Sequence, residues 1–265
     1  MFGYLIYNRE EKSINQVFIK NLIDAAKKRK ITLCYKNKDE LDLTTQKVMV
    51  DFAINRTRDF MLAKRLEERG IQVFNSSYTC QVGNDKLLCY QAMDILGERY
   101  LPLKSSELAF PYVCKSRAGH GGREVYMVTR QEELDLVRKK LKGKPYICQE
   151  IASELGKDLR VYMLGGQVVK AILRSSQDDF RSNYGLHGNA EVYSLSEKEA
   201  KRAKAIAEFI KGDYIGVDFL WHEGQWLFNE IEDVAGARML YERTDLDIAD
   251  LFLEYIKEVL NRTTK

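Results

Sequence analysis

The sequence predicts an α/β fold with a small open sheet at the N-terminus and two α+β lobes after it. Three features predict this arrangement. Strand-like and helix-like stretches alternate through the first eighty residues, a glycine-rich turn separates two apolar strands in the middle of the chain, and an acidic hairpin lies near the C-terminus. We therefore expect three consecutive units, at residues 1–82, 83–150 and 151–265.

The first unit has the rhythm of βαβ repeats, which favours a parallel sheet covered by helices. Gly70 lies where the C-terminus of a helix favours a left-handed residue. We expect residues 76–83 to form a linker. The predicted elements before it are strands at 4–7, 32–35, 48–54 and 73–75 and helices at 15–29 and 57–69.

The remaining elements are predicted from the same patterns of apolar residues. The second unit is expected to hold helices at 86–96 and 130–140 and strands at 112–115, 124–128 and 146–150. The third unit is expected to hold strands at 159–164 and 167–173, a helix at 197–210, the acidic hairpin and a last helix at 248–260.

Composition narrows the class of protein. The chain has 265 residues, enough to bury a hydrophobic core that is stable without disulfides or structural metals. Its five cysteines include no Cys-x-x-Cys pair, so we expect reduced thiols rather than disulfides or a zinc site. A net charge of +3 with both signs interspersed does not favour a nucleic-acid binder. Without a signal-peptide pattern or a bilayer-length apolar run, we expect a cytoplasmic protein with no membrane partner.

The acidic hairpin places three carboxylates together. Strand side chains alternate between faces, so Glu230 and Glu232 point the same way, and a turn near Gly224 sets Asp218 opposite Glu230. Three buried like charges need a cation, and oxygen ligands suit Mg²⁺ or Mn²⁺ better than zinc. The alternative is an acidic hairpin edge that faces water.

The glycine-rich turn predicts a phosphate-binding flap. Gly119, Gly121 and Gly122 allow close approach of the backbone to an anion, and Lys115 at the end of the preceding strand supplies positive charge. The turn lacks the spacing of a P-loop and precedes a strand, so neither a P-loop nor a dinucleotide fingerprint applies. The alternative is a flexible hairpin.

Arginines follow in the third unit. Arg160 shares a strand face with Asp158, Arg174 ends the next strand, and the loop after it carries Arg181 and Asn183. Guanidinium groups beside an acidic metal site would form a cradle for a triphosphate. The alternative is ordinary pairing with nearby carboxylates.

Together these motifs resemble the ATP-grasp ligases, and most closely their RimK-like branch, the ribosomal-protein glutamate ligase group. The resemblance runs from about residue 48 to the C-terminus, and its most specific parts are Asp179-Phe180-Arg181-Ser182-Asn183 and Thr244-Asp245-Leu246-Asp247-Ile248-Ala249. The motifs that carry it, in order, are Lys86, Lys115, Gln149-Glu150-Ile151, Asp158-Leu159-Arg160, the Asp179 segment, Gly216-Val217-Asp218 and Glu230-Ile231-Glu232.

The resemblance implies an ATP-grasp fold that clasps ATP between the second and third lobes. It implies that Lys86 and Lys115 bind the phosphates, that the Gln149-Glu150-Ile151 hinge contacts the adenine edge, and that Asp158 contacts the ribose. Arg160, Arg174 and Asn183 would face the transferring phosphoryl group. Asp218, Glu230 and Glu232 would bind two magnesium ions. Arg181 or Arg238 would orient a substrate carboxylate.

Two departures from the family pattern affect these expectations. Glu232 stands where many relatives have Asn, which adds a negative charge to the metal site. Residues 233–238 replace the family's usual Pro-Gly turn, which borders the acceptor substrate in such enzymes. The identity of the substrate is therefore not inferred from the family.

The resemblance implies an ADP-forming carboxylate-amine ligase that works through an acyl phosphate, joining an amino acid, with an acidic one favoured, to a peptide, a protein tail or a small amine. Two alternatives stay open: a nucleotide-binding regulatory module without turnover, and a small-molecule kinase with the same ATP site. Relatives of this kind often form homo-oligomers, but no patch in the sequence identifies one.

Overall fold

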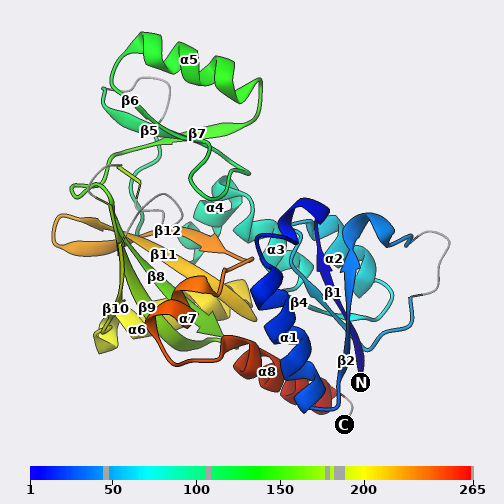
Figure 1. The fold of residues 1–265 in the computed structure, drawn as a ribbon. Helices are drawn as coiled ribbons and strands as arrows, with labels where there is room; N and C mark the ends of the chain where they lie inside the picture. The colour runs from blue at the N-terminus through cyan, green and yellow to red at the C-terminus, as the bar shows by residue number, and fades with distance from the viewer. Residues whose placement is uncertain (44–47, 105–108, 177–179, 182–188, 264–265) are drawn as a thin grey trace.

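The computed structural model describes residues 1–43, 48–104, 109–176, 180–181 and 189–263. Within these ranges the strands form three sheets, each built from one stretch of the chain. Figure 1 shows a lobe that carries β5 to β7 and α5 standing above a larger body, which contains the other two sheets. The α/β arrangement expected from the sequence is therefore confirmed.

The N-terminal sheet is open and parallel, with strand order β2-β1-β3-β4 across the described residues. Gly70 has a φ of +76° after the second helix, as its position predicted. The strands are β1 (Phe2–Tyr7), β2 (Thr32–Asn37), β3 (Phe52–Asn55) and β4 (Gln72–Phe74), and the helices are α1 (Gln16–Lys28) and α2 (Phe60–Glu67). Two 3-10 turns, η1 (Arg9–Glu11) and η2 (Lys38–Glu40), follow β1 and β2.

Two helices connect this sheet to the protruding lobe: α3 (Ser77–Gly83) and α4 (Lys86–Leu96). The prediction of a linker at 76–83 is wrong, because Ser76 caps a helix there by accepting a hydrogen bond from the backbone N–H of Thr79. Asp85 caps α4 in the same way, accepting from the N–H groups of Leu87 and Leu88. The two caps fix where each helix begins.

The protruding lobe is a three-stranded antiparallel sheet, order β6-β5-β7 in the described chain, covered by α5. Its apolar residues form a small core of their own, centred on Tyr112, Val128 and Val137. The elements are β5 (Tyr112–Ser116), β6 (Val125–Val128), α5 (Gln131–Leu141) and β7 (Tyr146–Gln149).

The third sheet is antiparallel, with order β10-β9-β8-β11-β12 where the chain is described. The sequence did not predict β10 or α7, which are short and lack a clear apolar period. The elements are β8 (Lys157–Leu164), β9 (Gln167–Ser175), β10 (Asn189–Tyr193), α6 (Glu197–Ile210), β11 (Tyr214–His222), β12 (Gln225–Glu232), α7 (Arg238–Arg243) and α8 (Ile248–Thr263).

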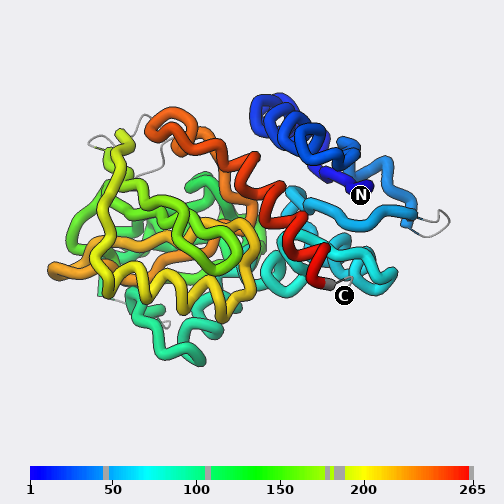
Figure 2. Tube along the Cα trace, turned by 90° about the horizontal axis from the view of Figure 1, so that it is seen from below, coloured from blue at the N-terminus to red at the C-terminus, as the bar shows by residue number. Residues whose placement is uncertain are grey.

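One apolar core joins the N-terminal sheet to the third sheet. Leu5, Phe18, Tyr214 and Phe252 belong to this cluster, and α1 packs against α8. Figure 2 shows these two helices side by side along the boundary between the sheets. Burial of this shared apolar surface fixes the two sheets relative to each other, whereas the protruding lobe depends on its own core.

Cys114 and Cys148 are neighbours on β5 and β7 and form a disulfide, with Cα atoms 4.3 Å apart. The expectation of five reduced cysteines is therefore wrong for this pair, because no local pattern predicts that two residues 34 positions apart face each other across adjacent strands. Over the residues that the structure describes, none of the helices is both long and apolar enough to cross a membrane.

Candidate active site

The acidic hairpin forms with the predicted register. Asp218 on β11 pairs with Glu230 on β12, and the turn residue Gly224 has a φ of +79°. A β-bulge next to Asp218 inserts Asn229 as an extra residue, and its side chain turns toward the protruding lobe, where Oδ1 accepts a hydrogen bond from Lys115 Nζ at 3.0 Å. Asn229 was not predicted as a site residue.

Asp218 is fully buried and held by two arginines. Arg160 on β8 donates from Nε and Nη2 to the two carboxylate oxygens at 2.7 and 2.6 Å, and Arg174 on β9 adds a bond from Nη2 at 2.8 Å. Arg174 also pairs with Asp158 in a fork. Burial opposes ionisation of Asp218, but the two guanidinium groups outweigh it and lower the carboxyl pKa to about 2.

The other two carboxylates also face cations. Glu230 pairs with Lys86 at 3.0 Å. Burial opposes ionisation of Glu230, but the charges of Lys86 and Lys115 outweigh it and lower the pKa of the Glu230 carboxyl. Glu232 lies 3.4 Å from Nη2 of Arg58 and 3.7 Å from Nη2 of Arg160. In the part of the chain that the structure describes, no group of three or more His, Cys, Asp or Glu side chains is arranged to hold a metal.

This arrangement still fits magnesium that arrives with phosphates. Mg²⁺ commonly uses one or two protein carboxylates, substrate phosphates and water rather than a full protein cage. Glu230 meets that need, since it lines the cleft described below and keeps 27% of its side chain exposed. Asp218 fits less well, because its side chain is 1% exposed and both oxygens bind arginines.

Two lysines lie at the top of the cleft. Lys86 begins α4 and its Nζ contacts the backbone oxygen of Gly119 at 2.5 Å as well as Glu230. Lys115, the next-to-last residue of β5, is almost fully buried, with its Nζ 3.1 Å from Tyr90 Oη. The pKa of Lys115 is lowered to about 8, chiefly by burial; the charge of Glu230 opposes this effect and that of Lys86 adds to it. A positively charged pair of this kind would favour a bound phosphate.

The glycine-rich turn lies over the same cleft. Gly121 and Gly122 have φ angles of +64° and +69°, which favour glycine. Gly119, His120, Gly121 and Gly122 all line the cleft, and Arg181 Nη1 donates to the Gly122 oxygen at 2.7 Å. Burial lowers the pKa of His120, and its electrostatic partners include Arg58 and Glu232, so the turn reaches toward the acidic hairpin.

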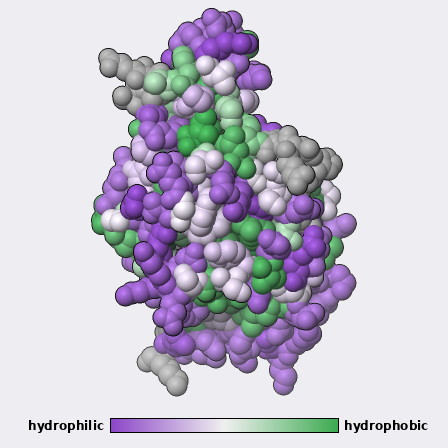
Figure 3. Space-filling model, turned by 90° about the vertical axis from the view of Figure 1, so that its left-hand side faces the viewer, coloured by the Kyte–Doolittle hydropathy of each residue, from purple (hydrophilic) through white to green (hydrophobic). Residues whose placement is uncertain are grey.

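The cleft lies between the protruding lobe and the third sheet. The space within it, counting the open solvent at its mouth, is about 810 Å³. Figure 3 shows apolar surface at the junction below the protruding lobe. The apolar side chains that line the cleft include Leu101, Val113, Val125, Ile151 and Leu220. An apolar pocket with lysines at one end suits a flat base joined to phosphates.

The predicted hinge residues also line this cleft. The Gln149 side chain is buried, donates to the Leu101 oxygen at 2.7 Å and accepts from Tyr90 Oη at 3.2 Å, so it connects β7 to α4 and to the segment before β5. Glu150 pairs with Lys104, and its N–H donates to the Pro102 oxygen at 3.0 Å. Ile151 contributes apolar lining.

The structure does not bring every predicted residue together. Asn183 lies outside the described residues. Arg238 is 61% exposed at the start of α7 and lies 3.8 Å from Glu242, so its side chain is not part of the cleft lining. The other predicted residues lie along the cleft or in the ion pairs beside it.

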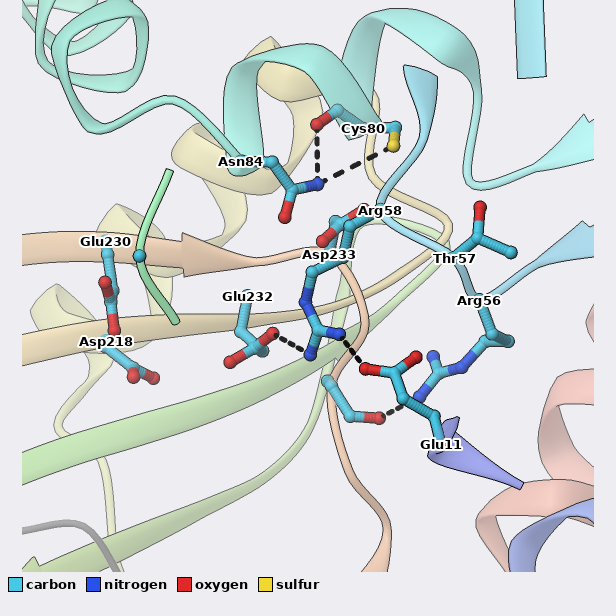
Figure 4. A network of polar contacts seen from close by, with 12 residues as sticks. Glu11, Arg56, Thr57, Arg58, Cys80, Asn84, Asp218, Glu230, Glu232 and Asp233 are labelled. Carbon is cyan, nitrogen blue, oxygen red and sulfur yellow. Dashed lines mark hydrogen bonds and ion pairs between the residues drawn. The ribbon is translucent and has the colours of Figure 1, made fainter. Parts of the chain in front are cut away.

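Sequence reasoning missed the contribution of the N-terminal unit. Figure 4 shows Arg58 reaching from the end of β3 between Glu11 and the hairpin residue Glu232. Arg58 Nη1 contacts Glu11 at 2.6 Å. No spacing rule links residues 11, 58 and 232, so only the packing of the two sheets brings them together.

The three sheets and the cleft form an ATP-grasp fold, which binds ATP. The chain is similar to D-alanine–D-alanine ligase from Bacillus anthracis complexed with ATP, with a TM-score of 0.76 and 17% identity, over 99% of this chain and 97% of that one. At this identity the similarity shows the fold alone.

The family model described as the RimK-like ATP-grasp domain matches residues 100–256. The chain therefore belongs to the RimK-like ATP-grasp family, and it is an ADP-forming ligase that makes a carbon–nitrogen bond. It is 26% identical to an uncharacterized protein of Mycoplasma genitalium, over 94% of this chain and 90% of that protein. It is also 26% identical to glutamate–LysW ligase ArgX of Sulfurisphaera tokodaii, over 73% of this chain and 75% of that enzyme.

Proposed function

We propose that this ligase joins an amino acid, with glutamate favoured, to a carboxylate on a peptide, a protein tail or a small molecule. The observation that carries the proposal is the set of cations around one cleft: Lys86 and Lys115 at its top, and Arg160 and Arg174 on the sheet beside it. The proposal keeps the division at residues 1–82, 83–150 and 151–265, since each range contains one of the three sheets.

The reaction proceeds in two steps. A carboxylate oxygen of one substrate attacks the γ-phosphorus of ATP, the bond to the β,γ-bridging oxygen breaks, and ADP leaves. An amine then attacks the acyl carbon, inorganic phosphate leaves, and the amine gives up a proton as the amide forms. Because charge develops on the transferring phosphoryl group, positioned cations are the main catalytic requirement.

In this proposal the lysines hold the phosphates and the arginines face the transferring group. Lys115 is well suited to its role, because a phosphate oxygen would compensate the charge that burial now disfavours. The glycine-rich turn closes over the phosphates, with Arg181 holding Gly122 in place. The Gln149-Glu150-Ile151 hinge and Asp158 line the base and ribose end of the cleft.

Glu230 is the main carboxylate for magnesium in this proposal, with Glu232 as the second ligand and Asp218 holding the two arginines. Magnesium held by these residues would supply positive charge against the phosphates. Two ions remain the expectation from the family resemblance.

The preference for glutamate rests on the names of relatives, among them the glutamate–LysW ligase ArgX. A nucleic-acid partner is not part of the proposal, since Lys86, Arg160 and Arg174 are each paired with carboxylates. Homo-oligomer formation and a cytoplasmic setting stay expectations from the sequence.

Product analysis tests the proposal. Purified protein is incubated with Mg-ATP, pooled amino acids and candidate carboxylate substrates, ADP and phosphate are measured, and products are weighed by mass spectrometry. We expect ADP release that needs both substrates and a product with the mass of an amide. Glu230→Gln should abolish turnover, whereas Glu223→Gln, an exposed change in the turn of the same hairpin, should not.

Each alternative has its own outcome. A phosphorylated substrate without an amide would indicate a small-molecule kinase and would reject the ligase. Mg-ATP binding without turnover in any pool would favour a regulatory module.

A further inference from the structure

Arg58 is held in an uncommon backbone conformation beside the acidic hairpin. It follows β3 with a φ of +59°, in the left-handed region that residues with side chains seldom adopt. Asn55 fixes the turn before it, since its Oδ1 accepts from the N–H and the hydroxyl of Thr57 at 3.2 and 2.7 Å. Asp59, the next residue, caps α2 by accepting from Leu62 N–H at 3.0 Å. Arg58 therefore points toward the third sheet because both sides of its turn are anchored.

The guanidinium of Arg58 belongs to a continuous chain of ion pairs, in which it is the second member after Glu11. The chain links the N-terminal unit to the nucleotide cleft, and its charges alternate in sign. Its members in order are Glu11, Arg58, Glu232, Arg160, Asp218, Arg174 and Asp158. Asp158 lines the cleft, so Arg58 marks the opposite side of the reaction site.

The two edges of this guanidinium are used unequally. Nη1 makes a short contact of 2.6 Å with Glu11, whereas Nη2 is 3.4 Å from Glu232. Nε is buried without a hydrogen-bond partner. The pair of donors Nε and Nη2 is the edge with which arginine binds a carboxylate in a fork. In this structure that edge has one loose contact and one unsatisfied donor.

We propose that the Nε and Nη2 edge of Arg58 binds a carboxylate of the incoming amino acid and so selects glutamate as the amine substrate. The substrate carboxylate replaces Glu232 at Nη2 and satisfies Nε, while Glu11 continues to hold Nη1. Glu232 keeps a cationic neighbour in Arg160 when it moves away. This inference rests on the proposed function and assigns a substrate-binding residue to it.

The position of Arg58 suits this role. A substrate amine must reach the acyl phosphate beside Arg160 and Glu230, and Arg58 is connected to Arg160 through the single carboxylate of Glu232. His120 from the glycine-rich turn interacts electrostatically with both Arg58 and Glu232. Closure of the turn over ATP would therefore also enclose the amino acid held by Arg58.

A binding experiment tests the inference without relying on turnover. The full chain is saturated with Mg²⁺ and a non-hydrolysable ATP analogue, and L-glutamate, L-glutamine and L-isoglutamine are titrated by calorimetry. The two amides each remove one carboxylate from glutamate. Arg58→Gln and Arg58→Lys are compared with the wild type, and Arg65→Gln, an exposed change on α2, is the matched control.

We expect Arg58→Gln to weaken glutamate binding about tenfold or more, the usual effect of losing a hydrogen-bonded charge pair. Arg58→Lys should recover part of the loss. The loss should be absent for the one amide that lacks the carboxylate held by Arg58, which identifies whether that is the α- or the side-chain carboxylate. Affinity for the ATP analogue should change less than about twofold, since Arg58 lies outside the cleft lining.

Three outcomes would overturn the inference. An equal loss for glutamate and both amides would show that Arg58 only supports the structure. Unchanged glutamate affinity in Arg58→Gln would remove its role while leaving the ligase intact. If the wild type binds no glutamate but releases ADP with an uncharged amine, both glutamate as the substrate and the role of Arg58 are rejected. If the wild type releases no ADP with any amine, the proposed function itself is rejected.

Discussion

Replacing Lys115 by methionine should make the protein more stable while weakening its binding of ATP. The Lys115 amine is almost fully buried, and burial lowers its pKa from 10.5 to about 8. That difference corresponds to about 3 kcal/mol of unfavourable free energy for the charged amine at neutral pH. Methionine has a similar length and no charge, so this cost disappears from the folded state.

The gain is reduced by two lost hydrogen bonds, to Tyr90 Oη and Asn229 Oδ1, each worth about 1 kcal/mol. We expect Lys115→Met to raise the free energy of unfolding by about 1 kcal/mol at pH 7, measured by urea denaturation. Between about pH 8 and 10.5 the unfolded lysine binds more protons than the folded one, so the stability of the wild type rises with pH in this window. The advantage of the variant should therefore shrink as the pH rises above 8.

ATP affinity should move in the opposite direction. Loss of a charged hydrogen bond to a phosphate is expected to weaken ATP binding by about 10- to 100-fold, measured by calorimetry with Mg-ATP analogue. Lys198→Met, an exposed lysine on α6, should change neither quantity. A loss of stability of more than about 2 kcal/mol in Lys115→Met would refute the reasoning, because it would mean that the buried charge stabilises the folded state in the absence of a phosphate.

Three further changes test other parts of the structure. Asp218→Asn leaves Arg160 and Arg174 buried without their shared counter-charge, so we expect a loss of about 3 to 5 kcal/mol in urea denaturation, and a loss under about 1 kcal/mol would contradict the assigned ion pairs. Burial raises the pKa of Asp213 to about 7, so the folded state binds more protons than the unfolded state between about pH 4 and 7 and loses stability as the pH rises through that range. The Asp213 side chain keeps some contact with solvent, which reduces the size of the effect. Asp213→Asn should therefore be more stable than the wild type by about 1 to 2 kcal/mol at pH 8 and equal to it near pH 4. A difference in stability that does not depend on pH would count against burial of the carboxylate as the cause. A Cβ on Gly3 would overlap the Phe52 ring, so Gly3→Ala should cost about 1 to 3 kcal/mol, and a neutral result in thermal unfolding would show that the ring can move aside.

The acidic hairpin shows what local patterns can predict. Alternation of apolar and acidic residues determined the faces of both strands, and the turn at Gly224 determined the register, so Asp218 was placed opposite Glu230 correctly. Trp221 and Trp226 also lie opposite each other across this hairpin, with ring centroids 4.9 Å apart. These features depend on residues fewer than twenty positions apart.

The remainder of the site depends on contacts across the whole chain. The bulge at Asn229 shifts one residue out of the alternating pattern, and no residue near it in the sequence signals this change. Arg58 reaches Glu232 across 174 positions, because the shared core holds the N-terminal sheet against the third sheet. The disulfide between Cys114 and Cys148 has the same origin, since strand pairing alone brings its two residues together.

The buried charges also explain how one site can accept a highly charged nucleotide. Without ATP, Glu230 neutralises Lys86, and Asp218 neutralises Arg160 and Arg174, so the desolvation of these cations is already balanced inside the folded protein. Under the proposed roles, a triphosphate with magnesium would enter by exchange: Lys86 would turn from Glu230 to a phosphate, and Glu230 would turn to the metal. Among the described residues Lys115 is in direct contact with no carboxylate, so a phosphate bound to it would not have to break an ion pair. For this reason the effect of Lys115→Met on ATP affinity should exceed that of Lys86→Met, and the opposite order would show that partner exchange is not how the site accommodates phosphate.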